Sequence, residues 1–144
     1  MQTQTMEQAV QAVTLAKAET EIRVTRRMEI GSVLMQGDVY LHRLPNDFKH
    51  GKLIKKGEMQ IAVGTGSGAR HVVVGDVEVY EPARLPPGVS APMGIEAREI
   101  MGPVIKAKKP ATLTHPEHAH HKFPAGLYGV TYQYDPKTMR RVAD

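Results

Sequence analysis

The sequence predicts a mainly β fold, a small antiparallel barrel or sandwich with an appended N-terminal helix. Three observations support this class. Thirteen glycines and 10 prolines in 144 residues punctuate the chain, which favours many short strands over long helices. Hydrophobic residues make up 41% of the chain and aromatics only 5%, so one domain with a small core is expected. Apolar and polar residues alternate with a period of two in several segments, as they do in half-buried strands.

Residues 1–34 are expected to form an extension of the compact β domain at 35–144. Thr5 and Gln8 have the spacing of a capping box, and a weak, alanine-rich apolar stripe follows on one helical face. This pattern predicts a helix over residues 5–19. The stripe buries little by itself, so the helix needs a partner surface from this domain or from a neighbouring chain.

Period-two alternation predicts the strands of the domain. Within 33–44, Gly37-Asp38 signals a turn or a bulge. Within 72–80, Gly75-Asp76 leaves open either one continuous strand or a hairpin. Residues 81–94 are rich in proline and predict an irregular loop. The strands are expected at 21–30, 33–44, 59–63, 72–80, 95–106 and 127–134.

Two loops share some features with phosphate-binding segments. Residues 49–58 carry lysines beside two glycines, which suits a solvated loop or an exposed hairpin, with phosphate contact as the alternative. Residues 64–68 read Gly-Thr-Gly-Ser-Gly, but the Gly-Lys-Ser/Thr ending of a P-loop is absent and a β-branched strand follows instead of a helix. We therefore interpret 64–68 as a hairpin loop.

Tyr128, Val130, Tyr132 and Tyr134 share one face of the strand expected at 127–134. Such a face is typical of the core side of a sheet, where cross-strand aromatic pairs stabilise the structure. A base-stacking platform would also use aromatic side chains near basic ones. Because the lysines are scattered over several loops, nucleic acid ranks last among the partners considered.

Composition excludes several classes of site. The absence of cysteine excludes disulfides, thiolate metal sites and cysteine nucleophiles. A net charge of +4 fits ordinary solubility. No signal-peptide pattern opens the chain and no apolar run approaches about 18 residues. We therefore expect a soluble protein outside the membrane, made in the cytoplasm and able to enter a larger particle later.

The clearest chemical signal lies at residues 113–121, which hold four of the seven histidines and one carboxylate. Neutral imidazole is the commonest protein ligand for transition metals, and a mixture of His and Glu suits Zn, Ni, Fe or Mn. The alternative is a solvated cluster, or histidines that form hydrogen bonds with turn carbonyls. The segment therefore predicts either a divalent metal site or a polar turn.

Six short motifs resemble a family of small uncharacterised proteins from bacteria and their phages. In this chain they read Gln-Gly-Asp-Val at 36–39, Gly-Ser-Gly-Ala-Arg-His at 66–71, Leu-Thr-His-Pro-Glu-His at 113–118, Pro-Ala-Gly-Leu-Tyr-Gly-Val at 124–130, Gln-Tyr at 133–134 and Arg-Arg-Val-Ala-Asp at 140–144. The resemblance runs from about residue 35 to the end, apart from the loop at 81–94. The resemblance implies no established activity, but it indicates which histidines belong to the candidate site.

Carried over residue by residue, the resemblance implies a set of metal ligands. His71 closes the family's TGHxH turn, whose first histidine is replaced here by Ala69. One ligand of that pattern is therefore missing. Either His120 or His121 replaces it, or this member has kept the fold and lost the site. The implied metal set is His71, His115, Glu117 and His118, with His120 and His121 as additional ligands.

Three functions are considered. A metal site of three histidines plus water would have the arrangement of a catalytic metal, but no acid–base pair or nucleophile with a partner accompanies it. We expect instead a non-enzymatic small β domain that acts by association with a protein partner or with itself through the N-terminal extension, with a divalent metal at the cluster as an option. The alternatives are a structural component of a phage-like particle, such as a capsid-associated or decoration protein, and a weak nucleic-acid-binding module.

Overall fold

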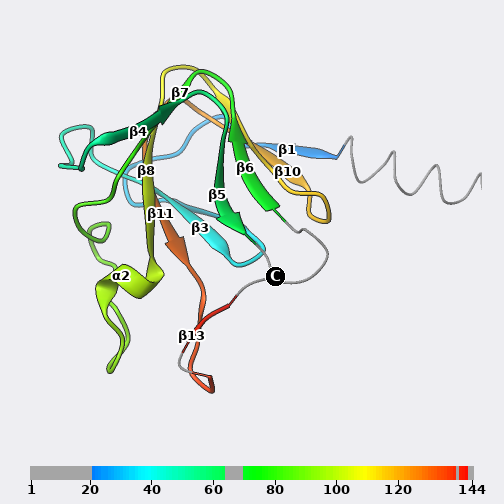
Figure 1. The fold of residues 1–144 in the computed structure, drawn as a ribbon. Coiled ribbons are helices and arrows are strands. Elements are labelled where there is room, and N and C mark those ends of the chain that lie inside the picture. The colour runs from blue at the N-terminus through cyan, green and yellow to red at the C-terminus, as the bar shows by residue number, and fades with distance from the viewer. Residues whose placement is uncertain (1–20, 64–69, 139, 143–144) are drawn as a thin grey trace, which may run out of the picture.

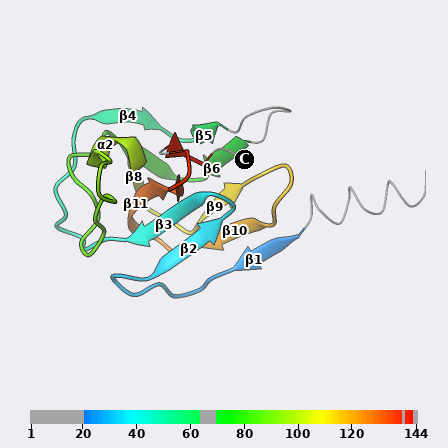
Figure 2. The ribbon, with the colours of Figure 1, turned by 90° about the horizontal axis from the view of Figure 1, so that it is seen from below.

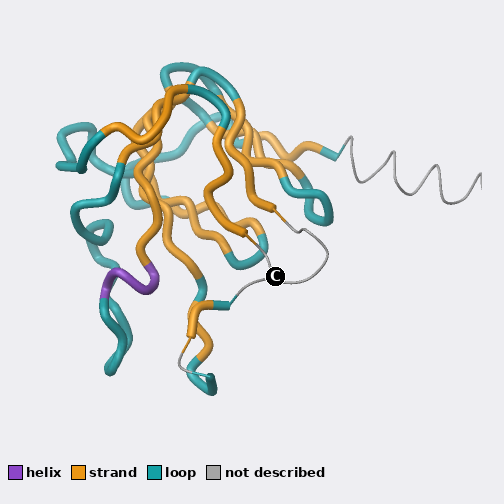
Figure 3. The backbone as a smooth tube through the Cα atoms, viewed as in Figure 1, coloured by secondary structure: helices purple, strands orange, loops and turns teal. Residues whose placement is uncertain are grey.

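The computed structural model describes residues 21–63, 70–138 and 140–142, and these form two large β-sheets and a small two-stranded one (Figure 1). The first sheet has the strand order β1 (Ile22–Val24), β10 (His120–Phe123), β9 (Ala111–Thr114), β6 (Arg70–Val74) and β5 (Met59–Val63). The second has the order β2 (Val33–Gln36), β3 (Val39–Arg43), β11 (Gly126–Tyr132), β8 (Met101–Ala107), β7 (Val77–Tyr80) and β4 (Leu53–Lys56). The two-residue strands β12 (Tyr134–Asp135) and β13 (Arg140–Arg141) pair with each other, and α2 (Ala97–Ile100) is a single helical turn. Strand is therefore the main regular structure of the described part (Figure 3).

Eight of the strands form four long strands, each bent once so that its two halves lie in different sheets. β4 continues into β5, β6 into β7, β8 into β9 and β10 into β11. Neighbouring long strands pair antiparallel on both sides of the bend, so β4 pairs with β7 while β5 pairs with β6. Strands that change sheet at a corner are one way to fold a meander into two packed layers. The predicted mainly β class is confirmed, but neither sheet of the described residues closes into a barrel.

The segment 72–80 turns such a corner. Gly75 has a φ of +132°, and a Cβ at this position would lie 3.3 Å from Cβ of Ala111. β6 and β7 lie in different sheets on either side of it, so the two halves do not pair as a hairpin. The segment is instead one strand with a bend at Gly75, and the bend is what the single-strand interpretation lacked. Alternation continues through the corner, because Val73 and Val77 are both buried, and the pattern therefore carried no sign of the bend.

The other predicted elements met mixed outcomes. Gly37, with a φ of +55°, makes the turn between β2 and β3, as predicted. Within 21–30 only β1 forms, and it is exposed rather than half-buried, since it lies at the end of its sheet. Part of 95–106 forms α2 instead of a strand, and residues 81–94 are irregular, as predicted. The helix expected at 5–19 lies outside the described residues.

The main core lies between the two sheets. Tyr128 of β11 is fully buried and packs edge-on against Phe123 of β10, with ring centroids 4.8 Å apart. Its hydroxyl donates to the carbonyl of Pro124, and burial raises the pKa of Tyr128 to about 12, with the nearby Arg43 opposing that rise. The interpretation of the tyrosine face as core is confirmed at Tyr128. No helix among residues 21–63, 70–138 and 140–142 is long and apolar enough to cross a membrane.

Candidate functional site: a buried histidine cluster between the sheets

Five polar residues from both sheets meet in the interior. Gln36 ends β2 and Asp38 lies in the turn that follows it, on the second sheet, while His71 lies in β6 of the first. His115 and His118 lie in the connection between β9 and β10. The side chains of Gln36, Asp38, His71 and His115 are at most 2% exposed. Buried polar groups need partners, so the hydrogen bonds here define what the cluster can do.

His71 is held between two acceptors. Nε2 of Gln36 donates to the carbonyls of Leu113 and Ala119, both at 2.9 Å, which fixes the orientation of its amide. Oε1 of Gln36 therefore accepts from Nδ1 of His71, and Oδ1 of Asp38 accepts from Nε2, each at 2.9 Å. A ring that donates from both nitrogens carries a positive charge. With Asp38 ionised, the geometry gives a buried His71–Asp38 ion pair that joins the two sheets.

His115 has the opposite arrangement. Its Nδ1 accepts from the backbone N–H groups of Glu117 and His118, at 3.0 and 3.1 Å. An accepting Nδ1 places the ring proton on Nε2. The ring lies 4.4 Å from that of His71 and 4.3 Å from that of His118, centroid to centroid. The turn that contains Pro116 is therefore closed by the imidazole itself, which accepts from two N–H groups, whereas the predicted alternative had histidines bonded to turn carbonyls.

The structure brings only part of the predicted metal set together. His71, His115 and His118 form one continuous stack of rings. Glu117 is exposed and enters the cluster through its backbone N–H alone. His120 and His121 lie in β10 beside β1. Burial, then Arg23 and His118, lower the pKa of His121, so its surroundings oppose added positive charge.

A metal ion would have to compete with these hydrogen bonds. Coordination needs a nitrogen lone pair, but His71 donates from both nitrogens and Nδ1 of His115 already accepts twice. Within the described ranges, no group of three or more His, Asp or Glu side chains is arranged to hold a metal ion. The metal set stays a prediction. The hydrogen bonds show that His71 and His115 have protein partners without a metal ion.

Sequence reasoning missed the roles of Gln36 and Asp38. Both lie in the Gln-Gly-Asp-Val segment, which carried the resemblance but received no place in the site. Their partner is more than 30 residues away in the sequence, so spacing alone could not reveal it. Only the structure shows that the amide of Gln36 and the carboxylate of Asp38, on either side of the turn glycine, are both buried and therefore belong to the site.

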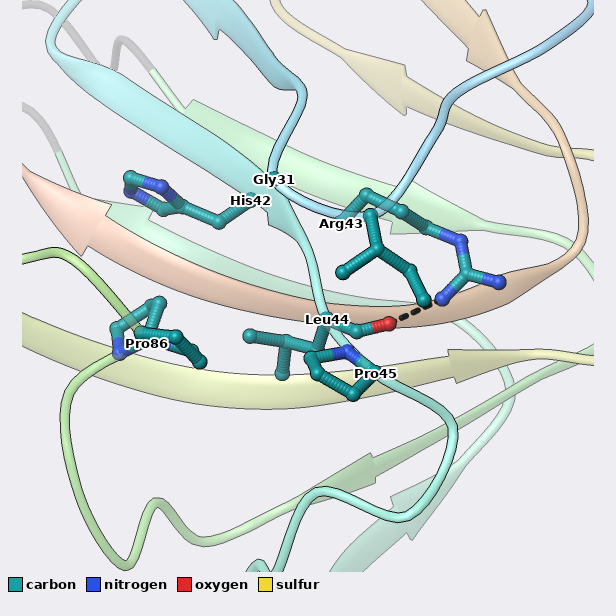
Figure 4. A pocket seen from close by; sticks show the side chains of 8 residues that line it. Gly31, His42, Arg43, Leu44, Pro45 and Pro86 are labelled. Atoms are coloured by element: carbon teal, nitrogen blue, oxygen red, sulfur yellow. Dashed lines mark hydrogen bonds between the residues drawn. The ribbon is translucent and has the colours of Figure 1, made fainter.

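A second polar group lies at the far end of β3. His42 forms a hydrogen bond with Thr131 through Nε2, at 2.7 Å, and burial lowers its pKa from the ordinary 6.5. Beside it, a pocket of about 50 Å³ is lined by prolines and by Leu44 (Figure 4). Figure 4 also shows the guanidinium of Arg43 turned toward the carbonyl of Leu44, to which it donates. The pocket has room for little more than water.

Both sheets end in a strand with exposed apolar side chains. Ile22 and Val24 of β1 and Val33 and Met35 of β2 are 49–63% exposed, and Ile30 between the two strands is 60% exposed. β1 and β2 are each the last strand of their sheet, and Figure 2 shows them along the same side of the molecule. We call these five side chains the edge strip. Exposed apolar strips on sheet edges mark association surfaces.

A family model described as Domain of unknown function (DUF8820) matches residues 35–133. The match contains all five residues of the buried cluster but leaves out β1 and Ile30. The searches of curated proteins and of solved structures found no match.

Proposed function

The chain belongs to the family described as Domain of unknown function (DUF8820), so we infer its function from the geometry of the chain itself. We propose that the protein acts by self-association through the open edge of β2. One observation supports this proposal above all. β2 is the last strand of its sheet, carries no charged residue, and exposes Val33 and Met35 while it buries Leu34 and Gln36.

The opposite edge of the same sheet shows the contrast. β4 also ends the sheet and exposes Leu53 and Ile54, but it carries Lys55 and Lys56. Lysines on an edge strand prevent pairing with another chain, because the pairing would bury their charge. Within the described residues, no lysine on β2 protects the open N–H and C=O groups of that strand in this way. The lysines of β4 therefore oppose association at one edge of the sheet, whereas the edge at β2 can pair with another chain.

The rest of the edge strip enlarges the surface. The segment 25–32 links β1 to β2, and Met28 from this link packs against the main core. Ile30 lies on the same link and stays exposed. Met28 thus fixes the link to the core, while Ile30 of the same link faces solvent. An apolar surface around an open strand can bury the area that backbone pairing alone would not supply.

A second copy of the chain is the occupant that fits β2. Antiparallel pairing of two identical strands about a twofold axis places each Val33 and Met35 against the same uncharged strand. No like charges meet in such a pair, although the chain carries a net charge of +4. Arg23, Arg26 and Arg27 lie on β1 and on the link, outside the pairing strand.

Sedimentation velocity over a concentration series tests the proposal. The wild-type chain is expected to dimerise, and the double variant Val33→Lys/Met35→Lys is expected to stay monomeric with an unchanged circular dichroism spectrum. Leu53→Lys/Ile54→Lys is the matched control, since it adds the same two charges to β4, and it should dimerise like the wild type. A wild type that is monomeric throughout overturns the proposal, and so does equal dissociation by both double variants.

A further inference from the structure

A hollow on the outer side of the second sheet combines an amide, a lysine ammonium and a histidine ring. It has a volume of about 300 Å³. Its lining residues are Asn46, His50, Lys106, Ala107, Gly126 and Leu127. We propose that this hollow binds an oxyanion, namely a phosphate or carboxylate group of a small molecule, through Asn46, His50 and Lys106.

Asn46 is turned so that its amino group can donate. Nη2 of Arg43 donates to Oδ1 of Asn46 at 3.1 Å. Because a guanidinium only donates, the amide oxygen must face Arg43, and the Nδ2 amino group is the part left to contact a ligand. The guanidinium of Arg43 is itself held in place, because it also donates to the carbonyls of Leu44 and Leu127.

Gly126 permits this arrangement. Its φ is +152°, and a Cβ at this position would lie 2.6 Å from Nε of Arg43. Only a residue without a side chain lets the guanidinium lie directly against the backbone here. The positive charge of Arg43 therefore stands close behind the floor of the hollow, where it adds to the attraction for an anion.

His50 forms a wall of the hollow. Its ring packs on the ring of Tyr80, with centroids 3.9 Å apart. Nδ1 of His50 faces the carbonyl of Gly51 at 2.9 Å and so carries a proton, which leaves Nε2 for a ligand. When the ring also carries a proton on Nε2, that atom donates to an oxyanion. The ring is thus oriented by contacts that do not use the atom a ligand would need.

Lys106 supplies a full charge, and the carboxylate nearest to it is engaged elsewhere. Glu78 is its cross-strand neighbour on β7. Oε1 of Glu78 lies 3.6 Å from Nζ of Lys108 instead. The pKa of Tyr80 is raised by burial and by the charge of Glu78, with which its hydroxyl forms a hydrogen bond. In the part of the chain that the structure describes, Lys106 makes no ion pair, so its ammonium can meet an incoming anion.

Titration with inorganic phosphate, followed by amide and His50 ring resonances in NMR spectra at constant ionic strength, tests the inference. We expect saturable chemical-shift changes that are confined to residues of the hollow. A parallel titration with acetate distinguishes phosphate binding from carboxylate binding, and a titration with chloride is the blank. Asn46→Asp keeps an acceptor for Arg43 but replaces the donor with a negative charge. It should weaken binding about tenfold or more, as should Lys106→Gln.

Lys122→Gln is the matched control, because it removes one lysine charge from β10 in the other sheet. Its phosphate affinity should stay within about twofold of the wild type, since Lys122 does not line the hollow and salt screens exposed charges. Shifts equal to those in chloride, or equal weakening by Lys106→Gln and Lys122→Gln, would overturn the proposal. Either result would mean that only the general positive charge of the chain attracts the anion.

Discussion

Nε2 of His71 in the first sheet lies 2.9 Å from Oδ1 of Asp38 in the second, and both side chains are buried. This pair is a direct polar connection between the layers, and it sits beside the apolar core that both sheets share. Removing two charges from water is costly, so such a pair adds little net stability compared with an apolar one. Its effect is to make the position of the β2–β3 turn specific, because any displacement leaves a charge without its partner.

Asp38→Asn is therefore expected to lower the free energy of unfolding by about 3–5 kcal/mol, since it leaves the His71 charge buried without its counter-charge. Urea unfolding measures this change. Asp47→Asn makes the same substitution at an exposed position and should cost less than about 0.5 kcal/mol. The double variant Asp38→Ala/His71→Ala should lose less than the sum of the two single variants. Equal costs for Asp38→Asn and Asp47→Asn would show that no ion pair exists.

His42 makes stability depend on pH on the acid side. Burial lowers its pKa in the folded chain below the ordinary 6.5 that the unfolded chain keeps. As the pH falls below 6.5, the unfolded chain binds the proton first, so stability is full above that value and declines below it. His42→Gln can keep a hydrogen bond to Thr131 without titrating. Thermal unfolding from pH 8 to pH 5 should show a shallower decline for this variant, and an unchanged slope would contradict the assignment.

Elemental analysis of the untagged protein decides the metal hypothesis. The hydrogen bonds of His71 and His115 predict less than one equivalent of any divalent metal per chain, and no loss of stability with chelator. The variant His115→Ala/His118→Ala is measured beside it. One equivalent of metal in the wild type and none in this variant would reinstate the metal set, with Glu117, His120 or His121 as further ligands.

Many strands were predictable because burial on one side imposes alternation, as at Val39 and Leu41, which are both fully buried. The strands β4, β9 and β10 were not among the expected ones. The corners were not, because a bent strand keeps its alternation while it changes sheet. The convergence of His71, His115 and His118 followed from the motifs that resemble a known family. What those rings do could not follow, because it depends on Gln36 and Asp38, which reach His71 only through the packing of one sheet on the other.

The pairing of β3 with β11 sets the order in which the domain can assemble. The long bent strands join neighbours along the chain, whereas Leu41 pairs with Val130, from nearly the other end of the described chain. Contacts between distant parts of a chain form slowly, because the loop between them must close first. On a ribosome, the β2–β3 hairpin would emerge early and wait, with both of its edges unpaired, until β11 follows. The uncharged edge of β2 is thus exposed to other nascent chains before the fold that positions it exists.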